Sequence, residues 1–188
     1  MYVVIEGIDT AGKSTQLDIL KENHKEAIFT KEPGGTEIGL KLRAMALNGE
    51  AKSKIAEMFL FLADRAEHIE EVIKPNEYKI VISDRSVISG IAYASNMPIE
   101  IVTTLNLIAT SNTLPSHVIL LELSKEELTK RLESKTNDSI ESRGIDYLID
   151  IQDRMKRTIK QLNLNYIFID ASLSIEEISK KIEDFING

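Results

Sequence analysis

The residues best suited to chemistry form one glycine-rich run near the start of the chain, Gly7-Ile8-Asp9-Thr10-Ala11-Gly12-Lys13-Ser14-Thr15. This run has the spacing G-x-x-x-x-G-K-[ST] of a phosphate-binding loop, the P-loop. In such a loop, backbone N–H groups and the N-terminus of the next helix point at phosphate oxygens. Lys13 adds a positive charge for the terminal phosphates, and the Ser14 hydroxyl can bind Mg²⁺. The run therefore predicts a site for a nucleotide's phosphates.

The segments on either side of this loop favour the motif over a chance glycine-rich turn. Residues 2–5 are apolar, as in a buried strand, and the apolar residues of 16–20 have helical spacing. A strand, a glycine-rich turn and a helix are the context that a P-loop requires. Within the loop, Asp9 could face an acceptor or its bound water.

Polar turns also follow the next two predicted strands, 27–30 and 78–83. The second ends in Asp84 and Arg85. A carboxylate at Asp84 could hold Mg²⁺ directly or through water, and Arg85 could bind a phosphate with two N–H groups. Ligands of parallel sheets bind beyond the carboxyl ends of the strands, so these turns should converge on one crevice.

Phe61 and Arg65 are four residues apart in a helix predicted from Ser53 through Ile73, so they share a face. An aromatic ring beside a guanidinium suits a base stacked next to its own phosphate. Core packing explains Phe61 equally well, and a solvated helix face explains Arg65 equally well. The cations between residues 131 and 143 could neutralise a donor phosphate, although composition alone favours an exposed charged segment.

Helical segments separate the predicted strands, which continue at 117–123 and 166–169. This alternation predicts an α/β protein in which helices cover both faces of a parallel sheet. No linker or repeat divides the chain, so we expect one domain over 1–188. Residues 134–144 are polar and charged, which is typical of a mobile segment.

Composition excludes several classes of protein. The net charge is −7 and there is no long basic run, which argues against a protein that wraps duplex nucleic acid. No cysteine is present for disulfides or thiolate chemistry. No apolar run approaches the ~18 residues of a membrane span, and the first residues lack a signal-peptide pattern. We therefore expect a cytoplasmic protein that binds neither nucleic-acid polymers nor membranes.

Four motifs together resemble the thymidylate kinase family in order and spacing. They are residues 7–15, residues 32–36 (EPGGT), residues 61–68 (FLADRAEH), and Ser83-Asp84-Arg85 with Ser89, Ala92 and Tyr93. Residues 170–172 are similar too. The resemblance implies a three-layer P-loop kinase fold, with a five-stranded parallel sheet and a short lid at about 134–144. It also implies phosphoryl transfer from ATP to dTMP with Mg²⁺, and a homodimer.

The resemblance further implies roles for individual residues. On the donor side, residues 7–15 bind ATP, Lys13 neutralises the transferring phosphoryl group, and Ser14 and Asp84 organise Mg²⁺. Because Ser139 replaces the lid arginine, the remaining cations are Arg131, Lys135 and Arg143, of which we expect Arg131 and Lys135 to clamp the donor phosphates. On the acceptor side, Arg65 and Arg85 would hold the dTMP phosphate, Phe61 would stack on thymine, and Arg43 would donate to a thymine carbonyl. The full substrate set is Asp9, Glu32, Pro33, Arg43, Phe61, Arg65, Arg85, Ser89 and Tyr93.

The chain departs from the family pattern at several positions. Lys31 precedes the Glu-Pro-Gly-Gly turn, where many relatives carry arginine, and arginine and lysine bind anions differently. Gly90 and Ala94 replace two polar residues that contact the base in relatives. Thr10 and Ser139 stand where some relatives place arginine in the P-loop or the lid.

Three other kinds of function share parts of this pattern. A deoxyribonucleoside kinase would phosphorylate a hydroxyl and need a carboxylate base, for which Glu32 would serve. A nucleotide switch should carry an Asn-Lys-x-Asp signature, which this sequence lacks. A non-catalytic P-loop scaffold is disfavoured by intact Lys13, Ser14 and Asp84.

Overall fold

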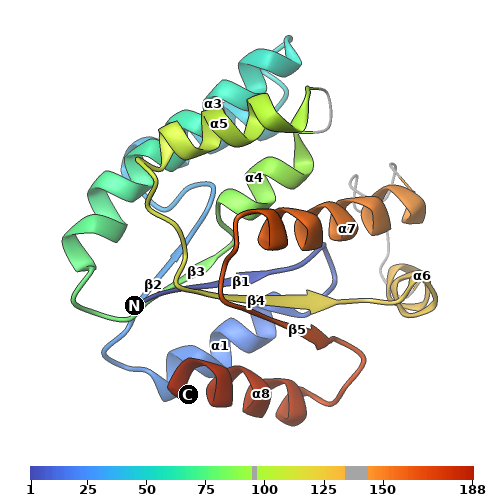
Figure 1. Cartoon of the computed structure of the whole chain (residues 1–188). Helices are drawn as coiled ribbons and strands as arrows, with labels where there is room; N and C mark the ends of the chain where they lie inside the picture. The colour runs from blue at the N-terminus through green and yellow to red at the C-terminus, as the bar shows by residue number, and fades with distance from the viewer. Residues whose placement is uncertain (95–96, 134–143) are drawn as a thin grey trace.

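The computed structural model describes residues 1–94, 97–133 and 144–188. Within these residues, five parallel strands form one sheet in the order β2-β3-β1-β4-β5 (Figure 1). The strands are β1 (Tyr2–Glu6), β2 (Ile28–Lys31), β3 (Val81–Asp84), β4 (His117–Glu122) and β5 (Tyr166–Asp170). The predicted five-stranded parallel sheet is therefore confirmed.

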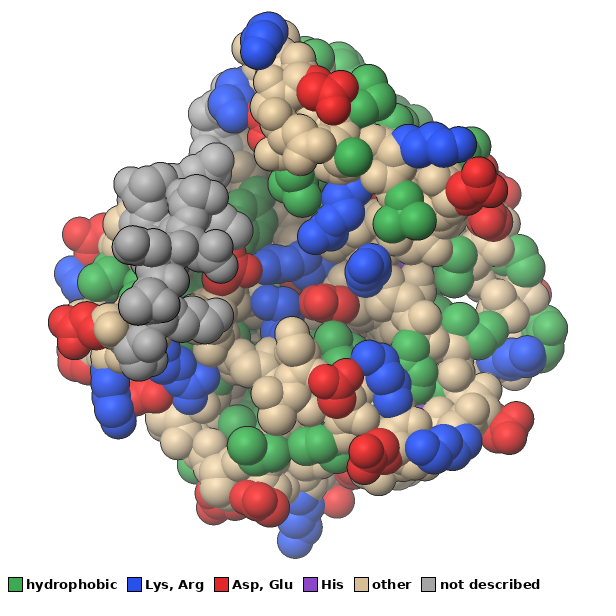
Figure 2. All heavy atoms as spheres, turned by 180° about the vertical axis from the view of Figure 1, so that it is seen from behind, with side chains coloured by type: hydrophobic (Ala, Val, Ile, Leu, Met, Phe, Trp, Pro, Cys, Tyr) green, Lys and Arg blue, Asp and Glu red, His purple; other side chains and the backbone are tan. Residues whose placement is uncertain are grey.

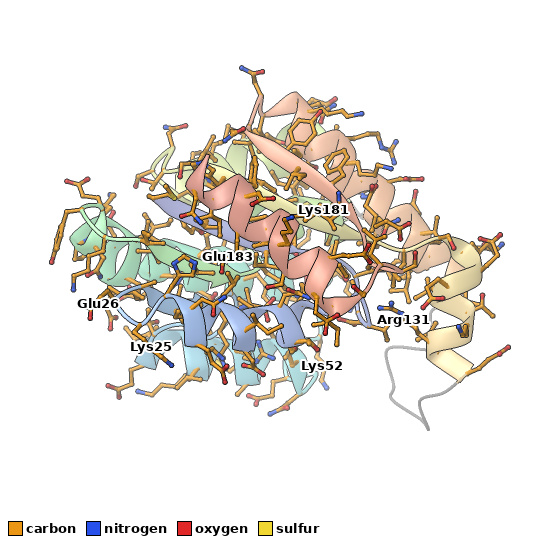
Figure 3. The ribbon with its side chains drawn as sticks, turned by 90° about the horizontal axis from the view of Figure 1, so that it is seen from below. Lys25, Glu26, Lys52, Arg131, Lys181 and Glu183 are labelled. Atoms are coloured by element: carbon orange, nitrogen blue, oxygen red, sulfur yellow. The ribbon has the colours of Figure 1, made fainter. Side chains whose placement is uncertain are left out.

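Helices cover both faces of this sheet (Figure 1). On one face lie α1 (Lys13–Asn23) and α8 (Ile175–Asn187), and on the other lie α4 (Val87–Tyr93) and α7 (Ile145–Gln161). All five residues of β1 are buried, as expected for a strand covered on both sides. Figure 3 shows Glu183 of α8 near α1, where its carboxylate accepts hydrogen bonds from Asn23 and His24 at 2.9 and 2.8 Å.

Within the described residues, four further α-helices lie around this three-layer core. Helices α3 (Lys54–His68) and α5 (Ile99–Ala109) run side by side beyond α4, and α2 (Glu37–Leu47) packs on α3 (Figure 1). Helix α6 (Lys125–Glu133) follows β4. No helix in the described parts of the chain is both long and apolar enough to cross a bilayer.

Serine side chains cap the first turns of two of these helices. The Ser53 hydroxyl accepts hydrogen bonds from the backbone N–H groups of Ile55 and Ala56 at the start of α3. Ser174 and Glu177 form a reciprocal capping box at the start of α8. Such side chains satisfy N–H groups that have no partner inside the helix.

One predicted boundary was wrong, and one helix keeps its predicted extent but changes form within it. The helix expected through Ile73 changes form at His68, and a π-helical turn (Ile69–Ile73) and a 3₁₀ turn (Lys74–Asn76) follow it. Pro75 has no backbone N–H to donate, so an α-helix cannot continue through residue 75. The strand expected from Tyr78 begins only at Val81, because residues 76–79 close a turn in which Lys79 N donates to Asn76 O.

The sheet register brings the polar turns together. Asp84 at the end of β3 pairs with Ile5 of β1 and with Lys31 of β2. The P-loop follows β1, and the Glu32–Gly35 turn follows β2. The turns after β1, β2 and β3 therefore lie together at the carboxyl edge of the sheet, as predicted.

Candidate active site

The P-loop is built by close backbone approach. A Cβ at Gly7 would lie 3.0 Å from Leu121 O, and Gly12, with φ of 94°, precedes the first residue of α1. Lys13 is buried, and its Nζ donates to Gly7 O at 2.9 Å and to Ile8 O at 3.3 Å. Burial lowers the pKa of Lys13 to about 8, with a further lowering by the Arg85 charge.

The two predicted metal residues line the same cavity. Ser14 of α1 and Asp84 of β3 face a cavity of about 350 Å³, which Lys31 also lines. Asp84 Oδ1 is buried and has no hydrogen-bond partner among the described residues. A buried carboxylate oxygen without a partner, beside a hydroxyl, fits the oxygen ligands of Mg²⁺.

Arg65 does not lie on a solvated helix face, because it is 4% exposed. Its Nε donates to Glu32 Oε2 at 2.8 Å, Nη1 to Asn106 Oδ1 at 2.7 Å, and Nη2 to Ser86 O at 3.3 Å. Glu32 Oε1 lies 2.8 Å from His68 Nδ1. Burial acts to raise the pKa of Glu32, but the charge of Arg65 and the His68 contact outweigh it, so the pKa is lowered. Glu32 is thus a charge partner that holds Arg65 in place.

The glycine at position 90 has a steric reason. A Cβ there would lie 2.5 Å from Arg65 Nη1 and 2.7 Å from its Cζ. These distances are shorter than any van der Waals contact, so a side chain at Gly90 would displace the guanidinium. The glycine that departs from the family pattern at this position therefore leaves room for the Arg65 guanidinium.

Arg85 links the P-loop to helix α4. Its Nη2 donates to Asp9 Oδ1 at 2.9 Å and its Nη1 to Ser89 Oγ at 3.1 Å, while its Cζ lies 5.5 Å from the centre of the Tyr93 ring. The Ser89 hydroxyl donates in turn to Glu6 Oε2 at 2.6 Å. Glu6 is fully buried, and burial raises the pKa of its carboxyl group. Four predicted site residues are thus brought together, and Glu6 joins them.

The turn after β2 is held by helices α2 and α3. Arg43 Nη1 donates to Pro33 O at 2.8 Å, and Gly34 N donates to Asp64 Oδ1 at 2.8 Å. Asp64 is 1% exposed, and burial raises the pKa of its carboxyl group to about 6. Phe61, one turn before Arg65 on α3, is partly buried.

Arg131 binds the protein itself. Its three nitrogens donate to Glu127 Oε1 at 2.8 Å, to Thr10 O at 2.9 Å and to Ala171 O at 2.6 Å. In Figure 3 its side chain points from α6 toward the body of the molecule. Arg131 therefore reaches the P-loop, as a donor-side residue should. Lys135 and the predicted lid, apart from Gly144, lie outside the described residues.

Sequence reasoning missed Glu6, Asp64 and Asn106. The sequence does contain a signal for Glu6, which directly follows the apolar run of residues 2–5. A carboxylate that is buried at the end of such a strand needs a partner. Nothing marks Asn106 within its helix. Figure 2 shows basic and acidic side chains gathered in a hollow of the surface, beside the grey atoms.

A P-loop whose Asp9 pairs with Arg85, beside the buried Arg65–Glu32 ion pair, is the arrangement of a nucleotide-binding phosphotransferase of the P-loop kinase class. A sequence model described as thymidylate kinase matches residues 5–182. The chain belongs to the thymidylate kinase family.

Similar proteins agree over the whole length. The thymidylate kinase of Aliarcobacter butzleri (strain RM4018) is 74% identical, over 100% of this chain and 99% of the relative. That of Wolinella succinogenes is 54% identical, over 97% of this chain and 96% of the relative. That of Sulfurimonas denitrificans is 51% identical over the full length of both chains. The resemblance seen in the four motifs is thereby confirmed.

Proposed function

We propose that this protein transfers the γ-phosphoryl group of ATP to the phosphate of dTMP, giving dTDP and ADP. Family membership supports the reaction, and one observation in the structure supports its location. Arg85 donates to Asp9 inside the P-loop and lies against Tyr93 of α4. A phosphate held by Arg85 would therefore meet the donor phosphates at the loop.

On the donor side, the catalytic task is to position the phosphates and neutralise their charge. Backbone N–H groups of the P-loop and the N-terminus of α1 would bind the ATP phosphates. Lys13 would turn from the loop carbonyls to the transferring phosphoryl group. Ser14 and Asp84 would hold Mg²⁺, which when bound neutralises charge on the phosphates, and the nucleotide would supply further oxygen ligands.

On the acceptor side, the charges favour a different division of labour from the one predicted. The positive charge of Arg65 is already balanced by Glu32, with both side chains at most 5% exposed. A balanced guanidinium suits a neutral carbonyl, so we assign Arg65 to the base, beside Phe61. Arg85 and Arg43 would then hold the dTMP phosphate, because Arg85 directly follows β3 at the sheet edge and Arg43 of α2 reaches the turn after β2. Asp9 and Tyr93 would contact the sugar.

The rival reaction, phosphorylation of a nucleoside hydroxyl, would need Glu32 as a base. Both oxygens of Glu32 are engaged, one by Arg65 Nε and the other by His68 Nδ1. The pKa of Glu32 is also lowered, which makes its carboxylate a weaker base. The acceptor phosphate of dTMP is already an anion and needs no such base.

The test is ADP release, measured by a coupled assay with ATP and one acceptor at a time: dTMP, dUMP, dCMP, dGMP or thymidine. We expect turnover with dTMP, weak turnover with dUMP and none with thymidine. Turnover with thymidine above that with dTMP would overturn the proposal. To test the division of labour, Arg65→Met should weaken binding of dTMP and of thymidine by the same factor, whereas Arg85→Met should weaken dTMP far more.

We further propose that the protein is a homodimer, joined through helices α2, α3 and α5. Support comes from large apolar side chains on these adjacent helices that are 42–68% exposed: Ile38, Leu40, Met45, Leu47, Ile55, Phe59, Ile101 and Ile108. Burying them against a second copy would remove this apolar area from water. Light scattering after size exclusion should give twice the chain mass for the native protein and a smaller mass for Phe59→Glu. A monomeric native protein would refute the dimer.

A further inference from the structure

Helix α7 lies beside α4, the short helix that carries Ser89 and Tyr93 (Figure 1). Arg154 of α7 is hydrogen-bonded to the end of α4. Its Nε donates to Ala92 O at 2.7 Å, and its Nη2 lies 3.5 Å from both Ile91 O and Ala94 O. One guanidinium thus contacts three successive or near-successive carbonyl groups. These contacts join residues that are 60 to 63 positions apart in the chain.

The contacts satisfy a need of α4 itself. The last four carbonyl groups of any helix lack intrahelical partners, and α4 has only seven residues. Its last turn is therefore half of the helix. A guanidinium at this end donates to orphan carbonyls and places positive charge at the negative end of the helix dipole.

The first turn of α4 is held separately. The Ser86 hydroxyl, which caps the helix, and the Ser89 hydroxyl both donate to the buried Glu6, at 2.8 and 2.6 Å. Glu6 belongs to β1, so the sheet fixes the start of α4. Arg154 fixes its end, where Tyr93 is the last helical residue.

We propose that Arg154 is a positioning residue for the acceptor site. By holding the last turn of α4, it keeps the Tyr93 ring against the Arg85 guanidinium and so keeps Arg85 on Asp9. Arg154 touches no substrate and acts only through α4. This inference rests on the proposed placement of dTMP beside Arg85 and Tyr93.

The test compares Arg154→Gln and Arg154→Lys with a control on the same helix, Arg157→Gln. Arg157 is one turn away, its side chain is 64% exposed, and it faces Asp150 at 3.7 Å. The measurements are kcat, KM for dTMP and KM for ATP, with hydrogen exchange of a peptide covering 87–94. Because the three variants change charge or length on one helix, they separate the carbonyl contacts from general effects on α7.

For Arg154→Gln we expect KM for dTMP to rise about 3- to 10-fold, the size of one or two lost hydrogen bonds. KM for ATP should stay within about twofold, because the three hydrogen bonds of Arg154 go to the end of α4 and not to the P-loop. Exchange in 87–94 should become faster. Arg154→Lys should recover part of both changes, since an ammonium also donates to carbonyls, and Arg157→Gln should match the native protein.

The inference is overturned if Arg154→Gln matches Arg157→Gln in KM for dTMP, or if it raises both KM values equally. Arg154→Lys behaving like Arg154→Gln in every measurement would also overturn it. Arg85→Gln separates this failure from failure of the proposed site. If Arg85→Gln leaves KM for dTMP unchanged, the placement of dTMP is wrong, whatever Arg154 does to exchange in α4.

Discussion

The acceptor and donor sides of the site differ in how their polar groups are satisfied. On the acceptor side, each nitrogen of Arg65 has a partner, both oxygens of Glu32 are engaged, and Glu6 accepts from two hydroxyls. On the donor side, Asp84 Oδ1 and Thr10 Oγ1 are buried without a partner within the described residues. One side is complete in the free protein, and the other leaves atoms for ligands.

This difference indicates which of the two substrate sites has its binding geometry in place before the substrate binds. Buried charges that are fully paired hold their geometry before a ligand arrives, so the acceptor side is preorganised. The donor side holds Lys13 at a pKa of about 8, because burial and the Arg85 charge both disfavour the charged form. ATP and its metal would complete that side. The predictions below test this contrast in order of expected effect.

The largest effect should come from Lys13→Met, which removes the mobile charge of the donor side. We expect kcat to fall by about 10²- to 10³-fold, as for loss of one group that stabilises developing charge. Binding of dTMP alone, measured by calorimetry, should stay within about twofold, because Arg65 and Arg85 remain in place. A large loss of dTMP affinity in this variant would show that the two sides are not separate.

Gly90→Ala should damage the acceptor side by steric displacement of Arg65. Overpacking of this kind costs about 1–3 kcal/mol, so KM for dTMP should rise about tenfold while KM for ATP stays unchanged. A double-mutant cycle with Arg65→Met identifies the cause. If Gly90→Ala is equally harmful when Arg65 is already absent, the contact with Arg65 does not explain the glycine.

ATP binding should depend on the charge of Lys13. The group is protonated below its pKa of about 8, so the ATP Kd should be flat at lower pH. Above pH 8, binding must take up a proton, and Kd should rise by up to about tenfold per pH unit. Lys13→Arg keeps its charge and serves as the control, with little change from pH 7 to 9.5. A flat native profile over that range would contradict the assignment.

The smallest effect concerns stability of the acceptor side. Burial raises the pKa of Asp64 to about 6, so the neutral form is favoured in the folded protein. The resulting stability is present at low pH and is lost as pH rises through about 6. Asp64→Asn keeps an acceptor for Gly34 N and should raise the free energy of unfolding at pH 8 by about 1–3 kcal/mol, and at pH 5 by about half as much, because the carboxyl group of the unfolded chain is already ionised there. Chemical denaturation at both pH values, with exposed Asp18→Asn as control, checks this; equal shifts at both would contradict it.

Local signals in the sequence were enough for the framework. The P-loop spacing, the helix start at Ser53 and the alternation of strand and helix each depend on residues a few positions apart. Burial of β1 follows from its unbroken apolar run. The differences from the predicted elements fall at residues 69–80, where a π-helical turn and a 3₁₀ turn follow the α-helix. The spacing of apolar residues does not show where one helix type gives way to another.

The site's supporting contacts could not be predicted in the same way. Arg65 and Asn106 are 41 residues apart, and Glu6 and Ser89 are 83 apart. The positions of these four residues in the sequence do not specify which residue each one contacts, because the packing of the helices decides which side chains meet. The sequence marks Gly90 only as a departure from relatives. The steric reason appears once α3 and α4 are placed beside each other.

The most direct test of the contrast is calorimetric titration of the native protein with dTMP in the absence of ATP and Mg²⁺. A preorganised acceptor side should bind dTMP without either, with a Kd close to the KM for dTMP. Adding a non-hydrolysable ATP analogue should change that Kd by no more than about threefold, less than 1 kcal/mol of coupling. Binding of dTMP that appears only after the ATP analogue and metal are added would contradict the account.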